Sequence, residues 1–364
     1  MRLLLNSLAA TAVCSLALVH AAEVPKFTVT TLAGTGVAGF SGDGGPASAA
    51  QIDHPTSVAV APDGTVYFAD FHNKRVRKIA VDGTISTVMG TGEETPQAED
   101  GPAATRNLMH PYGIGVDAQG NLYVANRLHA KIHKVTPDGM STTICGTGTA
   151  GFSGDGGPAR EAQVKGPNHV AFDAAGNIYI SDSGNSRVRK IDAAGIITTV
   201  VGNGERGMTG DGGPALEATL DGPTQAAFDA QGTMYIADFD NHALRKVTKD
   251  GIISTVMGNG KAGFTREDGI PAVSSKISQS AGVTVDSHGI VFVADSVPSR
   301  IRAILPDGNV YTVAGNGKRG YNGDGTPGPE TQLNIPDIIC VDREDNIYVA
   351  DHQGNRVRRL TRVK

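Results

Sequence analysis

The sequence predicts an all-β protein folded as a six-bladed β-propeller with four-stranded blades. A cluster of an aromatic residue, an apolar residue, a small residue and an acid or amide occurs six times. The copies begin at Tyr67, Tyr123, Tyr179, Tyr235, Phe292 and Tyr348, at spacings of 56 or 57 residues. Radial repetition of four-stranded units is typical of a propeller. The 48 glycines, 18 prolines and absence of tryptophan among 364 residues also suit many short strands better than long helices.

The same four elements follow one another in each copy. The first strand follows a proline in five of six copies, as at 55–60, and ends at a turn such as 117–120 in the second copy. The aromatic cluster is the second strand. The third strand alternates basic and apolar residues, as at 75–79, which is typical of a strand with one solvated face. An Asp-Gly or similar turn then leads to the fourth strand, as at 85–88.

The two ends of the repeat region are complementary. The sequence stops after the last third strand, 356–360, whereas 27–32 matches a fourth strand with no blade before it. We therefore expect the N-terminal strand to complete the last blade. Such closure pairs the terminal strands and removes an otherwise open seam.

The first 22 residues have the pattern of a secretory signal peptide. Arg2 precedes an apolar stretch at 3–19, and small residues follow at Ala21 and Ala22. We predict a signal peptide over 1–22 and a single propeller domain over 23–364, secreted or periplasmic, with an uncleaved anchor as the alternative. No second apolar run is long enough to span a bilayer.

Charge and cysteine content limit the partners. Loss of Arg2 with the leader changes the net charge from −5 to −6, which disfavours nucleic-acid binding. We expect the third-strand bases to pair with second-strand acids within each blade, as Arg75 would with Asp70.

Cys145 and Cys340 fall on different blades, which predicts separate thiols. A closed ring needs no partner for its own stability, so we expect a monomer.

The repeat resembles a known family. The Tyr-Val-Ala-Asp type of cluster, followed by residues such as Asn73 and Arg75, resembles the NHL repeat over 27–364. The Gly-Asp-Gly-Gly-Pro-Ala segment at 42–47, which returns from Gly154 and from Gly210, resembles the bacterial and teneurin-type NHL propellers. The resemblance implies the six-bladed ring. It implies less about function, because such propellers include protein-binding and RNA-binding modules, receptor ectodomains and a few metal-dependent lyases.

The long Gly-rich connections before the first strands have their own pattern. We predict a short helix from Pro46 through Ile52. An acid stands at or near the same place in each connection: Asp43, Asp100, Asp155, Asp211, Asp268 and Asp324. None shows the spaced acids of a calcium loop, so we interpret them as caps on loop amides.

Departures from the repeat predict a ligand-binding site on one face of the ring. We call this face the top; it carries the loops before the first strands and after the second strands. The mouth of the channel receives His54, His110, Tyr112, Asn168, His169 and Asp337. The loops after the second strands add Phe71, His72, Arg127, Phe239 and His352. Aromatic residues among polar ones favour a recognition surface.

The main functional prediction is a binding scaffold for a protein, peptide or glycan, with no catalytic residue assigned. The alternative is a metal-dependent lyase or hydrolase in which His54, His110 and His169 hold zinc and leave a coordination position for water. A lactonase-like enzyme with calcium in its channel is a third possibility, although Asp337 is the only acid among the mouth positions. Zinc or calcium is therefore a possible but unassigned cofactor.

Overall fold

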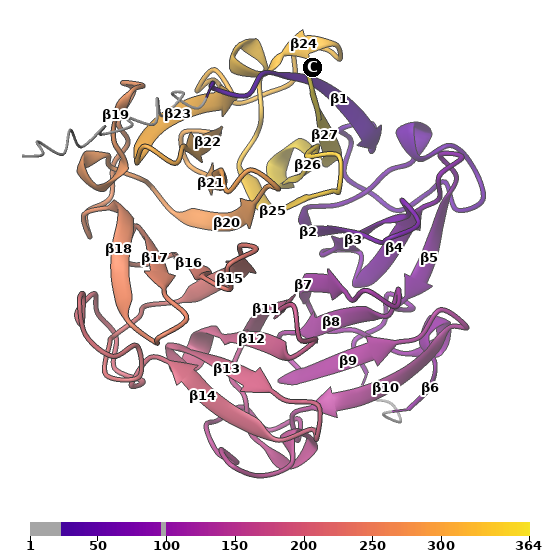
Figure 1. Ribbon diagram of the computed structural model, residues 1–364. Helices are drawn as coiled ribbons and strands as arrows, with labels where there is room; N and C mark the ends of the chain where they lie inside the picture. Colours follow the sequence, from indigo (N-terminus) through magenta and orange to yellow (C-terminus); the bar gives the residue numbers. More distant parts are fainter. Residues whose placement is uncertain (1–22, 96–99) are drawn as a thin grey trace, which may run out of the picture.

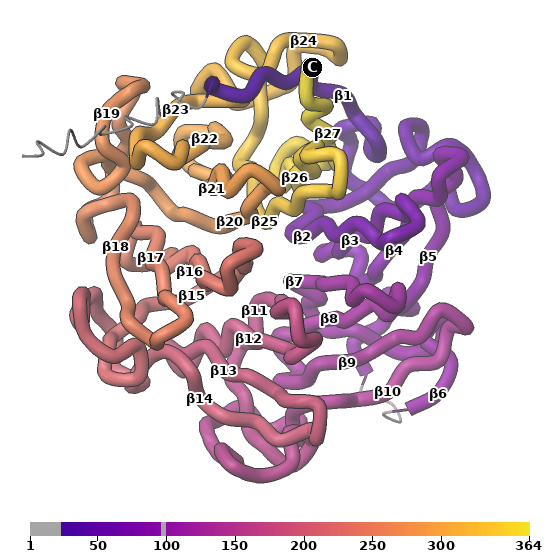
Figure 2. Tube along the Cα trace, in the orientation of Figure 1, coloured from indigo at the N-terminus to yellow at the C-terminus, as the bar shows by residue number. Residues whose placement is uncertain are grey.

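The chain forms a ring of six antiparallel sheets around a central axis (Figure 1). This computed structural model describes residues 23–95 and 100–364, so the predicted signal peptide at 1–22 lies outside the described residues. Each blade starts with its innermost strand and proceeds outward, and the six innermost strands follow one another around the channel (Figures 1 and 2). The prediction of a six-bladed β-propeller is confirmed.

The strands agree closely with the predicted segments. The first blade consists of β2 (Pro55–Val60), β3 (Val66–Asp70), β4 (Arg75–Ile79) and β5 (Ile85–Met89). The second consists of β7 (Pro111–Val116), β8 (Leu122–Asn126), β9 (Lys131–Val135), β10 (Met140–Cys145) and the short β6 (Gly101–Pro102). The third consists of β11 (Pro167–Phe172), β12 (Ile178–Asp182), β13 (Arg187–Ile191) and β14 (Ile197–Val201).

The remaining blades repeat this order. The fourth consists of β15 (Pro223–Phe228), β16 (Met234–Asp238), β17 (Ala243–Val247) and β18 (Ile253–Gly258). The fifth consists of β20 (Ser280–Val285), β21 (Val291–Asp295), β22 (Arg300–Ile304), β23 (Asn309–Ala314) and the short β19 (Ile270–Pro271). The sixth consists of β25 (Pro336–Val341), β26 (Ile347–Asp351), β27 (Arg356–Arg362), β1 (Phe27–Ala33) and the short β24 (Thr326–Pro327).

Helical structure among the described residues is limited to single 3₁₀ turns. They are η1 (Ala47–Ala49), η2 (Ala103–Thr105), η3 (Ala159–Glu161), η4 (Ser183–Asn185), η5 (Ala272–Ser274), η6 (Gly328–Glu330) and η7 (His352–Gly354). The helix predicted from Pro46 through Ile52 is thus shorter than expected, because the backbone is extended again at Ala50. No helix in 23–95 or 100–364 has the length and apolar character needed to cross a membrane.

The N-terminal strand closes the ring as predicted. β1 lies antiparallel to β27, with Phe27 opposite Arg362 and Ala33 opposite Val357 (Figure 1). Its inward side chains are buried, including Val29 at 0% exposure. Phe27 packs edge-on against Phe292 of the neighbouring fifth blade, with ring centroids 5.9 Å apart. The strand therefore contributes to the apolar core between blades as well as to its own sheet.

A buried arginine holds each blade except the second. In the first blade the Arg77 guanidinium is fully buried, 2.7 Å from Asp43 of the Gly-rich connection and 3.6 Å from Asp70. The predicted pair between Arg75 and Asp70 is wrong. Arg75 instead donates to two backbone carbonyls and lies over the Phe40 ring. Arg75 and Arg77 are two residues apart and therefore share one face of the strand. Arg77 reaches Asp70 from inside the blade, whereas Arg75 stays at the edge of the blade.

The acids of the Gly-rich connections have a different role from the predicted amide caps. Asp43 pairs with the buried arginine and also accepts hydrogen bonds from the backbone amide and hydroxyl of Thr87 on the fourth strand. Asp155 makes the same contacts with Arg189 and the Thr199 hydroxyl. Asp43 and Asp155 thus each fasten their connection to the third and fourth strands of a blade, whereas Asp100 of the second blade accepts a hydrogen bond from the Thr143 amide and pairs with Arg160.

The second blade has an amide and a histidine in place of this acid and arginine. Asn126 stands where the other blades have an acid, and His133 stands where they have the buried arginine. The Asn126 amide nitrogen lies 3.2 Å from His133 Nε2. The carboxylate and the guanidinium are thus both replaced in this blade, so neither is buried without the other.

The two cysteines of the described region, Cys145 and Cys340, are separate thiols, as predicted.

Candidate functional site

The loop residue before each first strand has an unusual backbone conformation. His54, His110, Gln279 and Ile335 have φ between 51° and 62°, and the glycines at 166 and 222 have φ of 56° and 61°. This left-handed region suits glycine and costs free energy for other residues. Two imidazoles therefore occupy positions at the channel mouth where the backbone alone would favour glycine.

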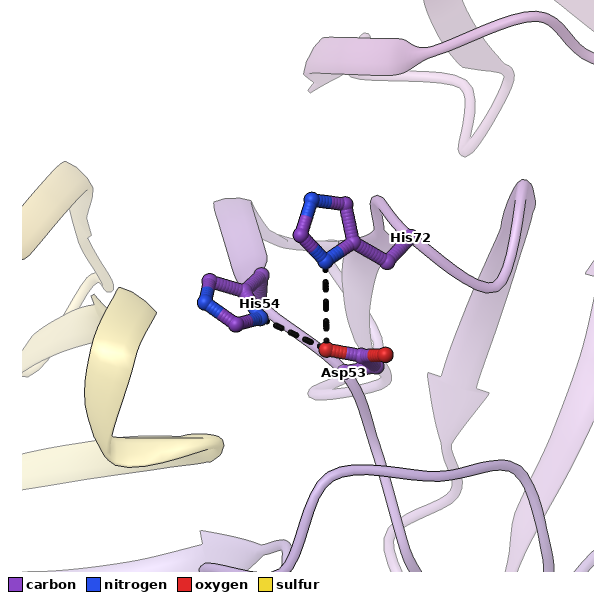
Figure 3. A group of neighbouring side chains, drawn as sticks. All are labelled: Asp53, His54 and His72. Carbon is purple, nitrogen blue, oxygen red and sulfur yellow. Dashed lines mark hydrogen bonds and ion pairs between the residues drawn. The ribbon is translucent and has the colours of Figure 1, made fainter.

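The loops of the first blade bring two imidazoles to one carboxylate (Figure 3). Asp53 Oδ1 lies 2.6 Å from His54 Nδ1 and 3.3 Å from His72 Nδ1. The two rings are close to each other, with centroids 4.3 Å apart. Both nitrogen atoms point at the same oxygen, so the three side chains form one polar group that faces solvent.

Asp53 was not among the predicted site residues. Its backbone amide donates to the repeated acid Asp70, and other blades make this contact from residues as different as Met109 and Lys165. The repeat therefore requires only a backbone amide at this position, and the side chain can differ from blade to blade. The sequence feature that could have identified Asp53 as a site residue is its position directly before His54.

The last blade adds a third imidazole across the closing seam. The His352 ring centroid lies 4.8 Å from that of His54, and His352 Nδ1 lies 3.3 Å from the carbonyl of Pro55. Burial lowers the pKa of His352 to about 4, so its imidazole is neutral at physiological pH. The His54 amide donates to Asn355 of the same blade. The site thus joins the first and last blades.

An aromatic surface continues from these imidazoles onto the second blade. The half-buried Phe71 ring lies 5.1 Å from His72, 4.7 Å from His110 and 5.8 Å from Tyr112. The Arg127 guanidinium lies 5.0 Å from the centroid of Tyr112. We call the gathered residues the mouth cluster: Asp53, His54, Phe71, His72, His110, Tyr112, Arg127 and His352.

Tyr112 connects the mouth cluster to the sixth blade inside the channel. Its hydroxyl donates to Asp337 Oδ2 at 3.1 Å. Asp337 is only 5% exposed, and burial raises its pKa to about 7. The carboxyl group is therefore only partly ionised near neutral pH.

Asp337 is expected to make stability pH-dependent. Its folded-state pKa lies above its unfolded value, so the native state binds the proton more tightly and gains stability as the pH falls from about 7 towards 4. We expect the stability of the wild type relative to Asp337→Asn to rise by about 2 kcal/mol between pH 8 and pH 5. Urea denaturation of both proteins at the two pH values measures this difference. An equal difference at both pH values would show that the carboxyl group has an ordinary pKa.

Three predicted site residues lie apart from the mouth cluster. Asn168 and His169 are buried on β11, at 4% and 7% exposure. Burial lowers the pKa of His169 to about 3, so it is neutral. Phe239 is half-buried in the fourth blade.

The predicted zinc ligands His54, His110 and His169 are not brought together in the structure. Within the described ranges, His54 instead forms a potential metal-ligand group with Asp53 and His72.

A large hollow lies on the opposite face, where the sequence predicted no site. A groove of about 1030 Å³ runs past turns of the sixth, first and second blades and includes Asp63, Asp117 and Asp342. Asp342 accepts a hydrogen bond from Tyr348, and Asp117 accepts the equivalent bond from Tyr123. Much of this polar lining therefore belongs to the structural repeat.

The comparison with protein families agrees with the repeat. The model of the Teneurin NHL domain matches residues 37–100, 148–209 and 203–266, which together make up half of the chain. The chain belongs to the NHL-repeat family. Human Teneurin-1 is 25% identical over 360 residues, and zebrafish (Danio rerio) Teneurin-3 is 26% identical over 356. The matches cover 87% of this chain but 12% of each teneurin, so the NHL propeller corresponds to a small part of those proteins.

Solved structures with low sequence identity share the NHL propeller's fold. An auxiliary nutrient binding protein from Bacteroides ovatus has a TM-score of 0.68 at 16% identity, covering 94% of this chain and 78% of that one. A gluconolactonase from Xanthomonas campestris has a TM-score of 0.58 at 14% identity, with coverages of 94% and 96%. Virginiamycin B lyase from Staphylococcus aureus has a TM-score of 0.54 at 15% identity, with coverages of 93% and 100%. Binding proteins and enzymes thus use this architecture, which leaves function to the site.

Proposed function

We propose that this NHL propeller is an exported binding module that recognises a protein, peptide or glycan through its top face. The observation that carries the proposal is the mouth cluster. Repeated acids and arginines hold the blades together, whereas the departures from the repeat on the first, second and sixth blades gather at one place. A ligand needs such an asymmetric surface, because a six-fold repeated one offers no single orientation.

The chemistry of the mouth cluster suits recognition. Phe71 offers an apolar ring to a sugar or a side chain, and the surrounding imidazoles and Arg127 offer hydrogen-bond donors. The nutrient-binding neighbours show that proteins of this fold act as binding proteins, which supports the proposal. Secretion or a periplasmic location is part of the proposal and rests on the pattern of residues 1–22.

Ligand binding is expected to depend on Phe71. We would screen oligosaccharides and peptides against the mature protein by thermal shift and measure the best ligand by calorimetry. Phe71→Ala should weaken that binding at least tenfold, because it removes a central ring that contacts three neighbouring rings.

Phe264→Ala is the matched control. Phe264 is also an exposed aromatic residue, at 45% exposure, but it lies in the long connection before β20, outside the mouth cluster. Its replacement should change affinity less than twofold. Equal effects of the two substitutions, or full affinity in Phe71→Ala, would place recognition elsewhere.

A further inference from the structure

Two groups of side chains among the described residues have the composition of a metal site, and they differ in one respect. Asp286, His288 and Asp345 already hold a cation, because Arg362 Nη1 lies 2.8 Å from Asp286 and 3.3 Å from Asp345. Asp53, by contrast, has ion-pair contacts only with His54 and His72 in the part of the chain that the structure describes. The first group is neutralised by a side chain, and the second offers its carboxylate to the two imidazoles alone.

We propose that Asp53, His54 and His72 bind a divalent transition-metal ion, with zinc as the best fit. The three donor atoms, a carboxylate oxygen and two Nδ1 nitrogens, all lie within 4.8 Å of one another. Figure 3 shows the two imidazole nitrogens directed at the same carboxylate oxygen. Zinc binds imidazole nitrogen and carboxylate oxygen at about 2.0–2.2 Å. An ion between the donors therefore requires small side-chain rotations that open the 2.6 Å contact between His54 and Asp53.

The donor set distinguishes zinc from calcium. Two imidazoles and one carboxylate suit zinc and other first-row transition ions. Calcium needs six to eight oxygen ligands, and Asp53 is the only carboxylate of the group. Each imidazole would bind through Nδ1 in the tautomer that carries its proton on Nε2.

The backbone holds the three ligands in place before any ion arrives. The Asp53 amide donates to Asp70 at 2.8 Å, and the Asp53 carbonyl accepts from the His72 amide at 3.2 Å. The His54 amide is fixed by Asn355 at 2.9 Å. The loops before β2 and after β3 are thus tied to each other and to the last blade. Little backbone ordering remains to oppose ion binding.

The site is open to solvent on one side. The side chains of Asp53, His54 and His72 are 24%, 29% and 47% exposed. Three protein ligands leave at least one zinc coordination position for water or for a donor atom of another molecule. Phe71 lies 5.1 Å from His72, so such a molecule would also meet an apolar ring.

Zinc titration of the mature protein, purified without a polyhistidine tag and freed of metal with a chelator, tests the site. We expect calorimetry to show one zinc ion per chain and His72→Ala to weaken binding at least tenfold. Cobalt should give a visible absorption spectrum that is lost in Asp53→Asn. The His72 side chain is 47% exposed, so we expect its replacement to leave the fold intact even if His54→Ala does not.

His288→Ala is the control, because it removes the histidine of the group that Arg362 already occupies. It should retain full zinc binding. No zinc binding by the wild type, undiminished binding by His72→Ala, or an equal loss in His288→Ala would overturn the assignment. The titration contains zinc alone, so its failure would leave the proposed recognition of a ligand by the top face as a separate question.

Discussion

Deletion of residues 23–33 is expected to unfold the ring at temperatures at which the protein of residues 23–364 is folded. The deletion removes β1 from the sixth blade and takes Phe27, Val29 and Ala33 out of the core. It also leaves the edge of β27 unpaired. Loss of one buried phenylalanine and one buried valine alone costs about 5 kcal/mol, a large part of the stability of an ordinary domain. Thermal denaturation followed by circular dichroism measures the effect.

Point substitutions in β1 test whether the burial of its inward side chains, and not only its pairing with β27, stabilises the ring. Val29→Asp places a charge in the core, whereas Thr30→Asp places it on the partly exposed face of the same strand. We expect the first to lower the melting temperature strongly and the second to change it by a few degrees at most. An unchanged melting temperature in the deletion variant would show that the ring does not need its N-terminal strand.

Replacement of the buried arginine of one blade is expected to have the second large effect. Arg189→Met leaves Asp182, which is fully buried, without its nearest cation and frees Asp155 of the connection. Removing one partner of a buried ion pair costs about 3–5 kcal/mol. Arg187→Met is the matched control, since Arg187 donates to two backbone carbonyls at the edge of the same strand. It should cost about 1 kcal/mol, and equal costs would contradict the different roles assigned to the two arginines.

The second blade provides the complementary experiment. Asn126→Asp alone would bury a carboxylate without the arginine that faces it in the other blades and should destabilise the fold. The double variant Asn126→Asp with His133→Arg would rebuild the pair of the other blades and should recover much of the lost stability. Urea denaturation of the single and double variants gives the coupling between the two positions.

The fold could be predicted almost to the strand ends, because the 56-residue repeat places equivalent segments in register. The strand 75–79 and the closing role of the N-terminal strand were both predicted correctly. Which arginine enters the blade was not, because Arg75 and Arg77 are both basic and share one face of the strand. Their roles depend on how the Gly-rich connection folds over the sheet, and a repeat of sequence letters does not contain that information.

For the candidate site, the sequence predicted which residues share the top face but not which of them contact one another. His54, Phe71, His110 and Tyr112 gather on the top face because the propeller fixes where their loops lie. His169 is instead enclosed, because the innermost strands approach closely: a Cβ on Gly113 of β7 would lie 1.9 Å from the carbonyl oxygen of Asn168. Such closeness between blades is a property of three-dimensional packing. From the sequence alone, His169 was therefore predicted at the open channel mouth, whereas it is buried.

Hydrogen–deuterium exchange with and without the best ligand from the screen tests most directly whether the top face is the functional surface. We expect ligand-dependent protection in the loops at 51–56, 71–74 and 109–112, which carry most of the mouth cluster. The turns at 61–64, 80–84 and 342–344 line the groove on the opposite face and should exchange equally in both samples. Protection confined to those turns would contradict the proposal and assign recognition to the groove.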